Sequence, residues 1–431
     1  MRKAVSLLLI ALVVLSGIWA SGSSEDENVI ELTFWNEFSD GARYEATVAM
    51  IDKFNEENPG IRIVNRPVAN DDYFMTLRTA MASGDGPDIV QTENLETLWQ
   101  FVRNGYILDI SDWYAERADR FVDGTISECM YDGKVYGIPL FNYAMGVFYN
   151  TEMLEEYGIE SIETWDEFLD ACQKFKDAGI APIALGNKYG WPGYHLLSPL
   201  LVRNVGAKRT LDAAVGNGEA KWNDPDFVDA VSHFEELNDR GFFTLGAASD
   251  DSGAATALFI SGRAPFIITG TFLLSSLEEA PPSFTVGVAP FPQFEGQKGD
   301  ATGISTISFG VSLSSECRDV EAGLKFLDTI SRLDVAEEFV RIGQLPSCVK
   351  GAVNSETANP LLVETSEKLN PPGAIALPFL DLILPAQLGE AGILATGSSA
   401  IITGEMNTQE WLDELQSQFE EAEPVLKQNM Y

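Results

Sequence analysis

Short apolar runs that alternate with helical periodicity constrain this chain more than any other feature of its sequence. Residues 30–34 predict a strand, residues 44–54 carry apolar side chains at helical spacing, and residues 61–64 predict a second strand. A further helical pattern over 74–81 and a short apolar run at 88–90 extend this β-α-β-α-β order. Such alternation predicts a largely parallel sheet with helices on both faces, where ligands gather at the carboxyl ends of strands.

Local signals place further elements along the chain. Thr164 followed by Glu167 predicts a capping box, in which each residue satisfies a backbone amide of the other. Asp224 before Pro225 predicts an N-cap followed by proline in the first turn of a helix. Additional strands are expected at 265–268, 285–289 and 306–311, and further helices over 320–330 and 411–426.

The first 22 residues have the layout of a signal peptide. Arg2 and Lys3 precede an apolar run over 5–15, and small residues follow up to Gly22, so cleavage is expected near Ala20 or Gly22. Ile18 stands where a lipoprotein would carry its lipidated cysteine. The sequence therefore predicts a freely diffusing periplasmic protein.

Composition narrows the classes of partner. The formal charge is −37 and becomes −39 once Arg2 and Lys3 are removed, so neither nucleic acid nor an anionic lipid surface is expected to bind. The two histidines, His195 and His233, make a histidine-based metal site improbable, and no metal or cofactor is predicted. The four cysteines permit either a disulfide or buried thiols, because the sequence does not select a pairing.

A series of short motifs in a fixed order resembles the extracellular solute-binding proteins that feed sugars to ABC importers, the maltodextrin-binding-protein type of family 1. The motifs are GPDIV at 86–90, YDGKVYGIP at 131–139, FYN at 148–150, TWDEF at 164–168, FISGRA at 259–264, TGTF at 269–272 and GVAPFP at 287–292. The resemblance implies an α/β periplasmic-binding-protein fold, with two discontinuous lobes and a hinge. It implies a first lobe at 29–143 plus 287–330 and a second lobe at 144–286 plus 331–431.

The resemblance also implies aromatic side chains that stack on a sugar in the second lobe. Trp191, with Tyr194 nearby, lies in a loop rich in glycine and aromatic residues, and it either stacks on the ligand or packs against its own domain. Phe272 stands where family members often carry tryptophan, so it retains a stacking face without the indole donor. A core role for Phe272 stays open, and Arg203 is expected in a surface ion pair.

In the first lobe, polar residues follow two predicted strands, where a ligand cleft is expected. Their carboxylates and amides can accept hydrogen bonds from sugar hydroxyls, although helix capping or solvation would explain them as well. Further candidates lie near the expected first crossing between lobes and, by resemblance, before a later strand. The candidates are Asn36, Glu37, Thr92, Glu93, Asn94, Asn142, Tyr143 and Thr302.

The leading hypothesis is a periplasmic binding protein without enzymatic activity that closes over a sugar or oligosaccharide and delivers it to a membrane permease. The protein is expected to be a monomer that reaches the membrane only through that permease. Closure requires the ligand to contact both lobes, because only differential affinity shifts the open and closed populations. Two alternatives stay open: a secreted glycoside hydrolase with a pair of catalytic carboxylates, and the same fold binding a cationic polyamine.

Overall fold

The structure is a computed structural model that describes residues 29–429, except positions 40, 94, 123, 217, 218, 372, 385, 386, 390 and 391. The expected signal peptide and the candidate ligand residue Asn94 lie outside the described residues. Within the described part, no helix is long and apolar enough to cross a lipid bilayer.

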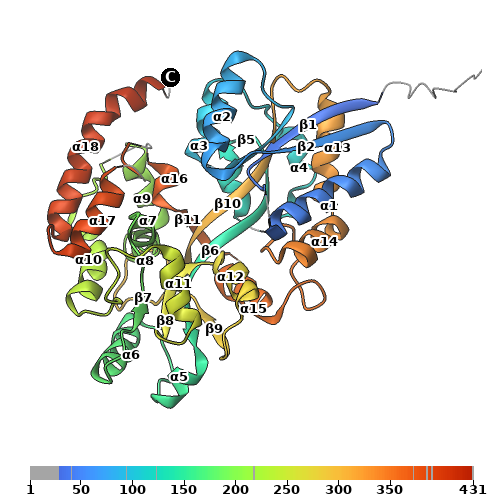
Figure 1. Cartoon of the computed structure of the whole chain (residues 1–431). Coiled ribbons are helices and arrows are strands. Elements are labelled where there is room, and N and C mark those ends of the chain that lie inside the picture. Colours follow the sequence, from blue (N-terminus) through green and yellow to red (C-terminus); the bar gives the residue numbers. More distant parts are fainter. Residues whose placement is uncertain are drawn as a thin grey trace, which may run out of the picture.

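One large sheet runs through the molecule (Figure 1). Its strand order is β2-β1-β3-β10-β6-β8-β7, with β11 beside β10 and β9 beside β6. A separate small sheet pairs β4 (Met130–Tyr131) with β5 (Lys134–Val135). The strands of the large sheet are β1 (Ile30–Asn36), β2 (Ile61–Pro67), β3 (Ile89–Glu93), β6 (Ile138–Asn150), β7 (Ile183–Ala184), β8 (Phe266–Gly270), β9 (Val286–Ala289), β10 (Gly303–Leu313) and β11 (Ile375–Pro378).

Two long strands, β6 and β10, join the two halves of the sheet, and Figure 1 shows them side by side between the lobes. The first half of β6 pairs with β10, while its second half pairs with β8 and β9. In the same way, the start of β10 pairs with β11 and its end pairs with β3. The two lobes therefore share continuous, hydrogen-bonded strands.

In the first lobe, helices cover both faces of the sheet, because buried side chains that follow one another along a strand point to opposite faces. Leu32 and Phe34 of β1 pack with one group of helices, whereas Trp35 packs on the opposite face with Tyr73. The helices on the first face are α1 (Gly41–Glu57), α13 (Val320–Ile330) and α14 (Leu333–Gly343), and those on the second are α2 (Asn70–Ser83) and α3 (Glu96–Arg103).

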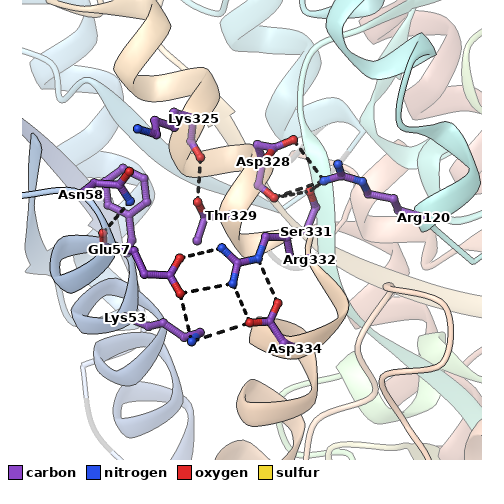
Figure 2. A network of polar contacts seen from close by, with 11 residues as sticks. Lys53, Glu57, Asn58, Arg120, Lys325, Asp328, Thr329, Ser331, Arg332 and Asp334 are labelled. Carbon is purple, nitrogen blue, oxygen red and sulfur yellow. Dashed lines mark hydrogen bonds and ion pairs between the residues drawn. The ribbon is translucent and has the colours of Figure 1, made fainter.

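An ion-pair network links α1 to α14 (Figure 2). Arg332, directly before α14, donates to Glu57 at the end of α1 and to Asp334 in the first turn of α14. Lys53 lies 3.1 Å from Glu57 and 3.6 Å from Asp334, so it joins both carboxylates. The network therefore adds ion pairs to the apolar contact of the two helices.

The second lobe surrounds the other half of the sheet with two hydrophobic clusters. Val147 of β6 faces the larger cluster, and its neighbour Phe148 faces the smaller one. Helices of the larger cluster include α5 (Thr151–Glu156), α6 (Trp165–Asp177), α7 (Trp191–His195), α8 (Leu197–Asn204), α9 (Ala207–Ala214), α10 (Pro225–Asp239), α16 (Leu380–Ile383), α17 (Ile393–Thr403) and α18 (Thr408–Asn429). Those of the smaller cluster include α11 (Ser252–Ile260), α12 (Leu273–Glu279) and α15 (Pro360–Leu369).

Two predicted helix starts have different outcomes. The capping box of α6 is confirmed, because Thr164 accepts a hydrogen bond from the Glu167 amide and the Glu167 carboxylate accepts one from the Thr164 amide. At α10, Asp224 occupies the N-cap position before Pro225 but makes no side-chain cap. Its carboxylate instead accepts hydrogen bonds from Arg209 and from the amide of Lys221.

The contacts disagree with the expected lobe division at two places. Strand β9 pairs with the second-lobe half of β6, so the chain returns to the first lobe through β10 and not at residue 287. Helix α14 packs on α1, and residues 347 and 349 form bridges to 141 and 121, so these contacts connect the segment 331–349 to the first lobe. The rest of the division stays a prediction.

None of the four cysteines, all of which are described, forms a disulfide. Three of them are buried, and burial raises the pKa of the Cys129, Cys172 and Cys348 thiols well above the ordinary value. They behave as small apolar core residues.

Candidate functional site

A cavity of about 1060 Å³ lies between the two lobes. From the first lobe it is lined by the start of α1, by α2, and by residues of β3, β6 and β10. From the second lobe it is lined by α7, the start and end of α12, and the segment around α16. Its lining residues are Gly41, Ala42, Arg43, Phe74, Glu93, Tyr143, Trp191, Tyr194, His195, Phe272, Ser275, Glu278, Glu279, Ile307, Phe309, Phe379, Asp381 and Leu382.

Three aromatic rings on the cavity wall lie edge to face across the junction of the lobes. The ring of Trp191 lies 5.9 Å from that of Phe272, at 72°, and the ring of Tyr143 lies 5.7 Å from Phe272, at 86°. Trp191 and Phe272 come from the second lobe, whereas Tyr143 comes from β6 where it enters that lobe. Trp191 and Phe272 are each partly exposed, so they present apolar surface to the cavity.

Glycines next to these aromatics make their positions possible. Gly190 precedes Trp191 with a φ of 79°, and a Cβ there would meet the backbone of Ala395 at 2.6 Å. A Cβ on Gly270 would lie 2.3 Å from the ring of Phe272. The glycine-rich loop and the TGTF motif therefore hold the two rings at the cavity.

The second-lobe wall also carries a histidine and a carboxylate. His195 lies one turn after Trp191 on α7 and is 9% exposed, and within the described part of the chain neither of its ring nitrogens has a hydrogen bond. Its Nε2 lies 3.5 Å from Oδ1 of Asp381, and Tyr194 donates to Oδ2 of Asp381 at 3.3 Å. Unsatisfied buried polar groups cost about 1–3 kcal/mol each, so this pair is costly unless solvent or a ligand satisfies it.

In the first lobe, charged groups lie at the end of β1 and the start of α1. Burial raises the pKa of the Glu37 carboxyl to about 7, against an opposing effect of Arg43. Burial also raises the pKa of Tyr143, and Arg43 again opposes the rise through its charge and a hydrogen bond. Arg43 also lines the cavity, so the charge that opposes both pKa shifts borders the solvent-filled space.

Five of the predicted ligand residues lie on the cavity wall: Glu93, Tyr143, Trp191, Tyr194 and Phe272. Tyr194 is 1% exposed and donates a hydrogen bond to Asp381, whereas Trp191 and Phe272 are partly exposed. Both roles that the sequence left open for Phe272 apply, since the ring packs against Tyr143 and also borders the cavity.

The structure does not bring five other predicted residues to this cavity. The Asn36 side chain is fully buried and donates to Asn65, while Asn142 donates to Asn370. Glu37 and Thr92 are buried beneath the wall at the strand ends. Thr302 is exposed in the turn before β10. Strand-end position alone therefore did not separate residues that face the cavity from those whose side chains point into the lobe.

Arg203 also differs from its expected surface position. It lies near the end of α8, a helix buried along almost its whole length, and is 4% exposed. Its Nε and Nη1 atoms find no hydrogen-bond partner among the described residues, and burial lowers the pKa of its guanidinium.

Several cavity residues carry no signal in the sequence that would have selected them. Phe309 and Phe379 occur within strand-like or proline-flanked apolar runs typical of core. His195 and Asp381 become a pair only because α7 and α16 fold together. The others are Arg43, Phe74, Glu278 and Glu279.

Comparisons with known proteins agree with this architecture. The model of the family described as bacterial extracellular solute-binding protein matches residues 39–334. The Multiple sugar-binding protein of Streptococcus mutans is 25% identical over 358 residues, covering 79% of this chain and 80% of that protein. The Melibiose/raffinose/stachyose-binding protein MelE of Bacillus subtilis is 24% identical over 297 residues, covering 67% of each chain.

A solved structure, that of a chitin oligosaccharide binding protein, is 25% identical and has a TM-score of 0.78, covering 92% of this chain and 99% of that chain. The fold and the resemblance inferred from the ordered motifs are thereby confirmed. Because the family model matches well over half of its length, the chain belongs to the family of bacterial extracellular solute-binding proteins.

Proposed function

We propose that the protein is the solute-binding component of an ABC importer, and that it captures a sugar or oligosaccharide between its lobes. The observation that carries this proposal is the cavity of about 1060 Å³ whose wall combines partly exposed aromatic rings with polar groups from both lobes. The loaded protein presents its ligand to a membrane permease. It acts in the periplasm, after export, and as a monomer.

The chemistry of the wall suits a carbohydrate. Apolar C–H faces of a sugar ring pack on the exposed faces of Trp191 and Phe272, as in ligand pockets that combine apolar walls with a few polar groups. Glu93 in the first lobe and Asp381 in the second lobe supply charged acceptors for the hydroxyl groups of the sugar. The volume of the cavity, about 1060 Å³, lies slightly above the usual range of about 300–1,000 Å³ for ligand pockets, which favours an oligosaccharide.

The names of the relatives support the same class of ligand. The three described above are named as binders of multiple sugars, of melibiose, raffinose and stachyose, and of chitin oligosaccharide. All are binding proteins, which supports a role without catalysis for this chain. Glu93, Glu278, Glu279 and Asp381 also give the cavity a surplus of carboxylates over its single arginine, so a cationic ligand is retained as an outcome of the test.

Calorimetric titration of the mature protein with di- and oligosaccharides tests the proposal. We expect saturable binding of one sugar class with a dissociation constant near the micromolar range, about −8 kcal/mol. Trp191→Ala should weaken that binding about tenfold or more, because it removes a stacking face at the centre of the wall. Tyr189→Ala is the matched control, since Tyr189 lies in the same loop but is 58% exposed and outside the cavity lining.

Three results would contradict the proposal. Sugar release from an oligosaccharide would indicate a hydrolase, and spermidine binding without sugar binding would indicate a polyamine carrier. Equal loss of affinity in the Trp191 and Tyr189 variants would indicate that the ligand binds outside the cavity.

A further inference from the structure

The imidazole of His195 is enclosed by aromatic rings on the cavity wall. Its ring centre lies 4.2 Å from that of Phe379, 5.0 Å from that of Tyr194 and 5.1 Å from that of Trp191. These contacts fix the plane of the imidazole but offer its nitrogens no hydrogen bond, and neither nitrogen has one among the described residues. A histidine that served only as a core residue would normally have a partner for its ring nitrogens.

Asp381 faces the same space from the segment around α16. Its Oδ2 accepts the hydrogen bond from Tyr194, which orients the carboxylate. Its Oδ1 is buried and has no hydrogen-bond partner among the described residues, and it lies 3.5 Å from Nε2 of His195. One oriented acceptor and one imidazole nitrogen therefore lie next to each other, and both residues line the cavity.

We propose that His195 and Asp381 are the polar anchor of the ligand in the second lobe, and that they select a ligand with two adjacent hydroxyl groups. The inference rests on the proposed function and specifies the chemistry that the second lobe recognises. One hydroxyl donates to Oδ1 of Asp381. Its neighbour hydrogen-bonds to the imidazole, which acts as donor or acceptor according to its tautomer.

The spacing supports a diol over a single group. The two protein atoms lie 3.5 Å apart, so two adjacent hydroxyls can each bond one of them at an ordinary hydrogen-bond length of about 2.7–3.0 Å. The Trp191 ring lies 5.1 Å from the same imidazole, tilted by 54°, so a sugar ring packed on Trp191 would lie beside these hydroxyls. The aromatic rings thus pack on the apolar face of the sugar, while His195 and Asp381 form hydrogen bonds to the hydroxyl groups at its edge.

Nuclear magnetic resonance tests the pair directly, because the chain has two histidines. Raffinose, chitotriose and maltotriose are titrated into the wild-type protein at constant pH while the imidazole signals are followed. We expect the signals of His195 to shift with the binding isotherm from calorimetry. The signals of His233 should stay in place, because that ring lies on α10 with its Nδ1 3.3 Å from Glu236 and outside the cavity lining.

Variants separate recognition from packing. His195→Gln and Asp381→Asn should each weaken binding tenfold or more, with a combined loss smaller than the product of the two, because both contact the same diol. His233→Gln should bind as the wild type does. A deoxy analogue of the bound sugar that lacks the recognised hydroxyl should bind equally to wild type and to Asp381→Asn.

Two outcomes overturn the inference in distinguishable ways. If a sugar binds while the His195 signals do not move, or if the Asp381→Asn variant keeps wild-type affinity and thermal stability, the pair is no anchor and the proposed function still stands. If no sugar of the calorimetric panel of di- and oligosaccharides gives a binding isotherm or any imidazole shift, the proposed function fails and the anchor fails with it.

Discussion

Glu37 is a carboxyl group that the fold removes from water at the end of β1. It is 4% exposed, its Oε2 has no hydrogen-bond partner among the described residues, and Arg43 lies close enough to oppose the effect of burial on its pKa. The net result is a pKa raised from 4.5 to about 7. The folded protein therefore binds a proton here that the unfolded chain releases between those two values.

This shift predicts a pH dependence of stability that belongs to one residue. Because the folded pKa is raised, the contribution of Glu37 is most favourable below pH 4.5 and is lost as the pH rises to about 7. The loss amounts to about 3 kcal/mol, at 1.36 kcal/mol per pKa unit. Urea unfolding at pH 4.5 and pH 8 should therefore show that Glu37→Gln gains about this much relative to wild type at the higher pH.

The control for this prediction is Glu31→Gln on the same strand, because Glu31 is exposed. That variant should track the wild type at both values of pH. A constant difference between Glu37→Gln and the wild type across the range would show that Glu37 titrates normally.

Asp88 has the opposite shift. Although burial raises its pKa, hydrogen bonds from Arg318 and Thr33 outweigh that effect and lower the pKa to about 2. Its stabilising contribution is therefore present above the unfolded value of 3.8 and is lost as the pH falls through 2. Asp88→Asn should lower the free energy of unfolding by about 2 kcal/mol at pH 7.

Chemical unfolding of Asp88→Asn at pH 7 and at pH 2 checks this sign, since the deficit should shrink at the lower pH. Asp85→Asn, three residues earlier and exposed, should show no deficit at either pH. A deficit that is unchanged at pH 2 would attribute the effect to packing and not to charge.

Single residues were predictable where their partners are close in sequence. The reciprocal bonds of Thr164 and Glu167 depend on three residues of chain, so the motif alone located them. His195 and Asp381 are partners only in the folded state, and no local pattern connects them. Glu37 was correctly placed at a strand end, but its burial follows from the packing of α1 and α2 around that end.

At the scale of elements, α1 and α14 share an apolar contact and a charged one. Val335 and Phe339 of α14 belong to the same core cluster as Met50 and Phe54 of α1, and the Arg332 network of Figure 2 lies beside them. Arg332 bonds Glu57 through two nitrogens, so one carboxylate holds the two helices together. The participants are about one third exposed or more, so solvent screens the network substantially.

Arg332→Met should lower the free energy of unfolding by about 1 kcal/mol at low salt, and by less at 1 M NaCl, because the exposed pairs are screened. Arg341→Met is the control within α14, since Arg341 pairs locally with Glu338 and has no ion pair to another helix among the described residues. Urea midpoints at the two salt concentrations measure both variants. If Arg341→Met lowered the free energy of unfolding as much as Arg332→Met, the ion pairs between the helices would stabilise the protein no more than a pair within one helix.

The order of the early elements was predictable, but the route of the chain between lobes was not. Strands β1, β2 and β3 were found from their apolar runs, because each is short and flanked by turn residues. Strand β6 is buried along nearly its whole length, so its residues show no alternation that would reveal where one lobe ends. Strand β10 was found only in part, and its pairing with β11 at one end and β3 at the other could not be foreseen from local sequence.

For the whole molecule, the important relation is that one ligand can contact both lobes. Glu93 and Phe74 face the cavity from the first lobe, whereas Trp191 and Asp381 face it from the second. A ligand that bonds both sets favours the closed arrangement by the difference in its contacts between the two arrangements. The strands β6 and β10 continue through the junction, so closure bends or twists them without separating the lobes.

Small-angle X-ray scattering should therefore give a smaller radius of gyration for the protein saturated with its sugar than for the free protein. Trp191→Ala, measured at a ligand concentration that saturates the wild type, should stay closer to the free value. An unchanged radius at full occupancy, established by calorimetry, would mean that the ligand rests on one lobe alone.

The position of β10 also sets the time at which the chain can fold. This strand lies between β3 and β6, although at least 150 residues separate it from either in sequence. During synthesis from the amino terminus, the sheet of the first lobe lacks the strand that pairs with β3 and β6 until β10 has been made. Contacts between residues so far apart in sequence also form slowly. The first lobe therefore cannot complete its sheet until residues 303–313 have been made.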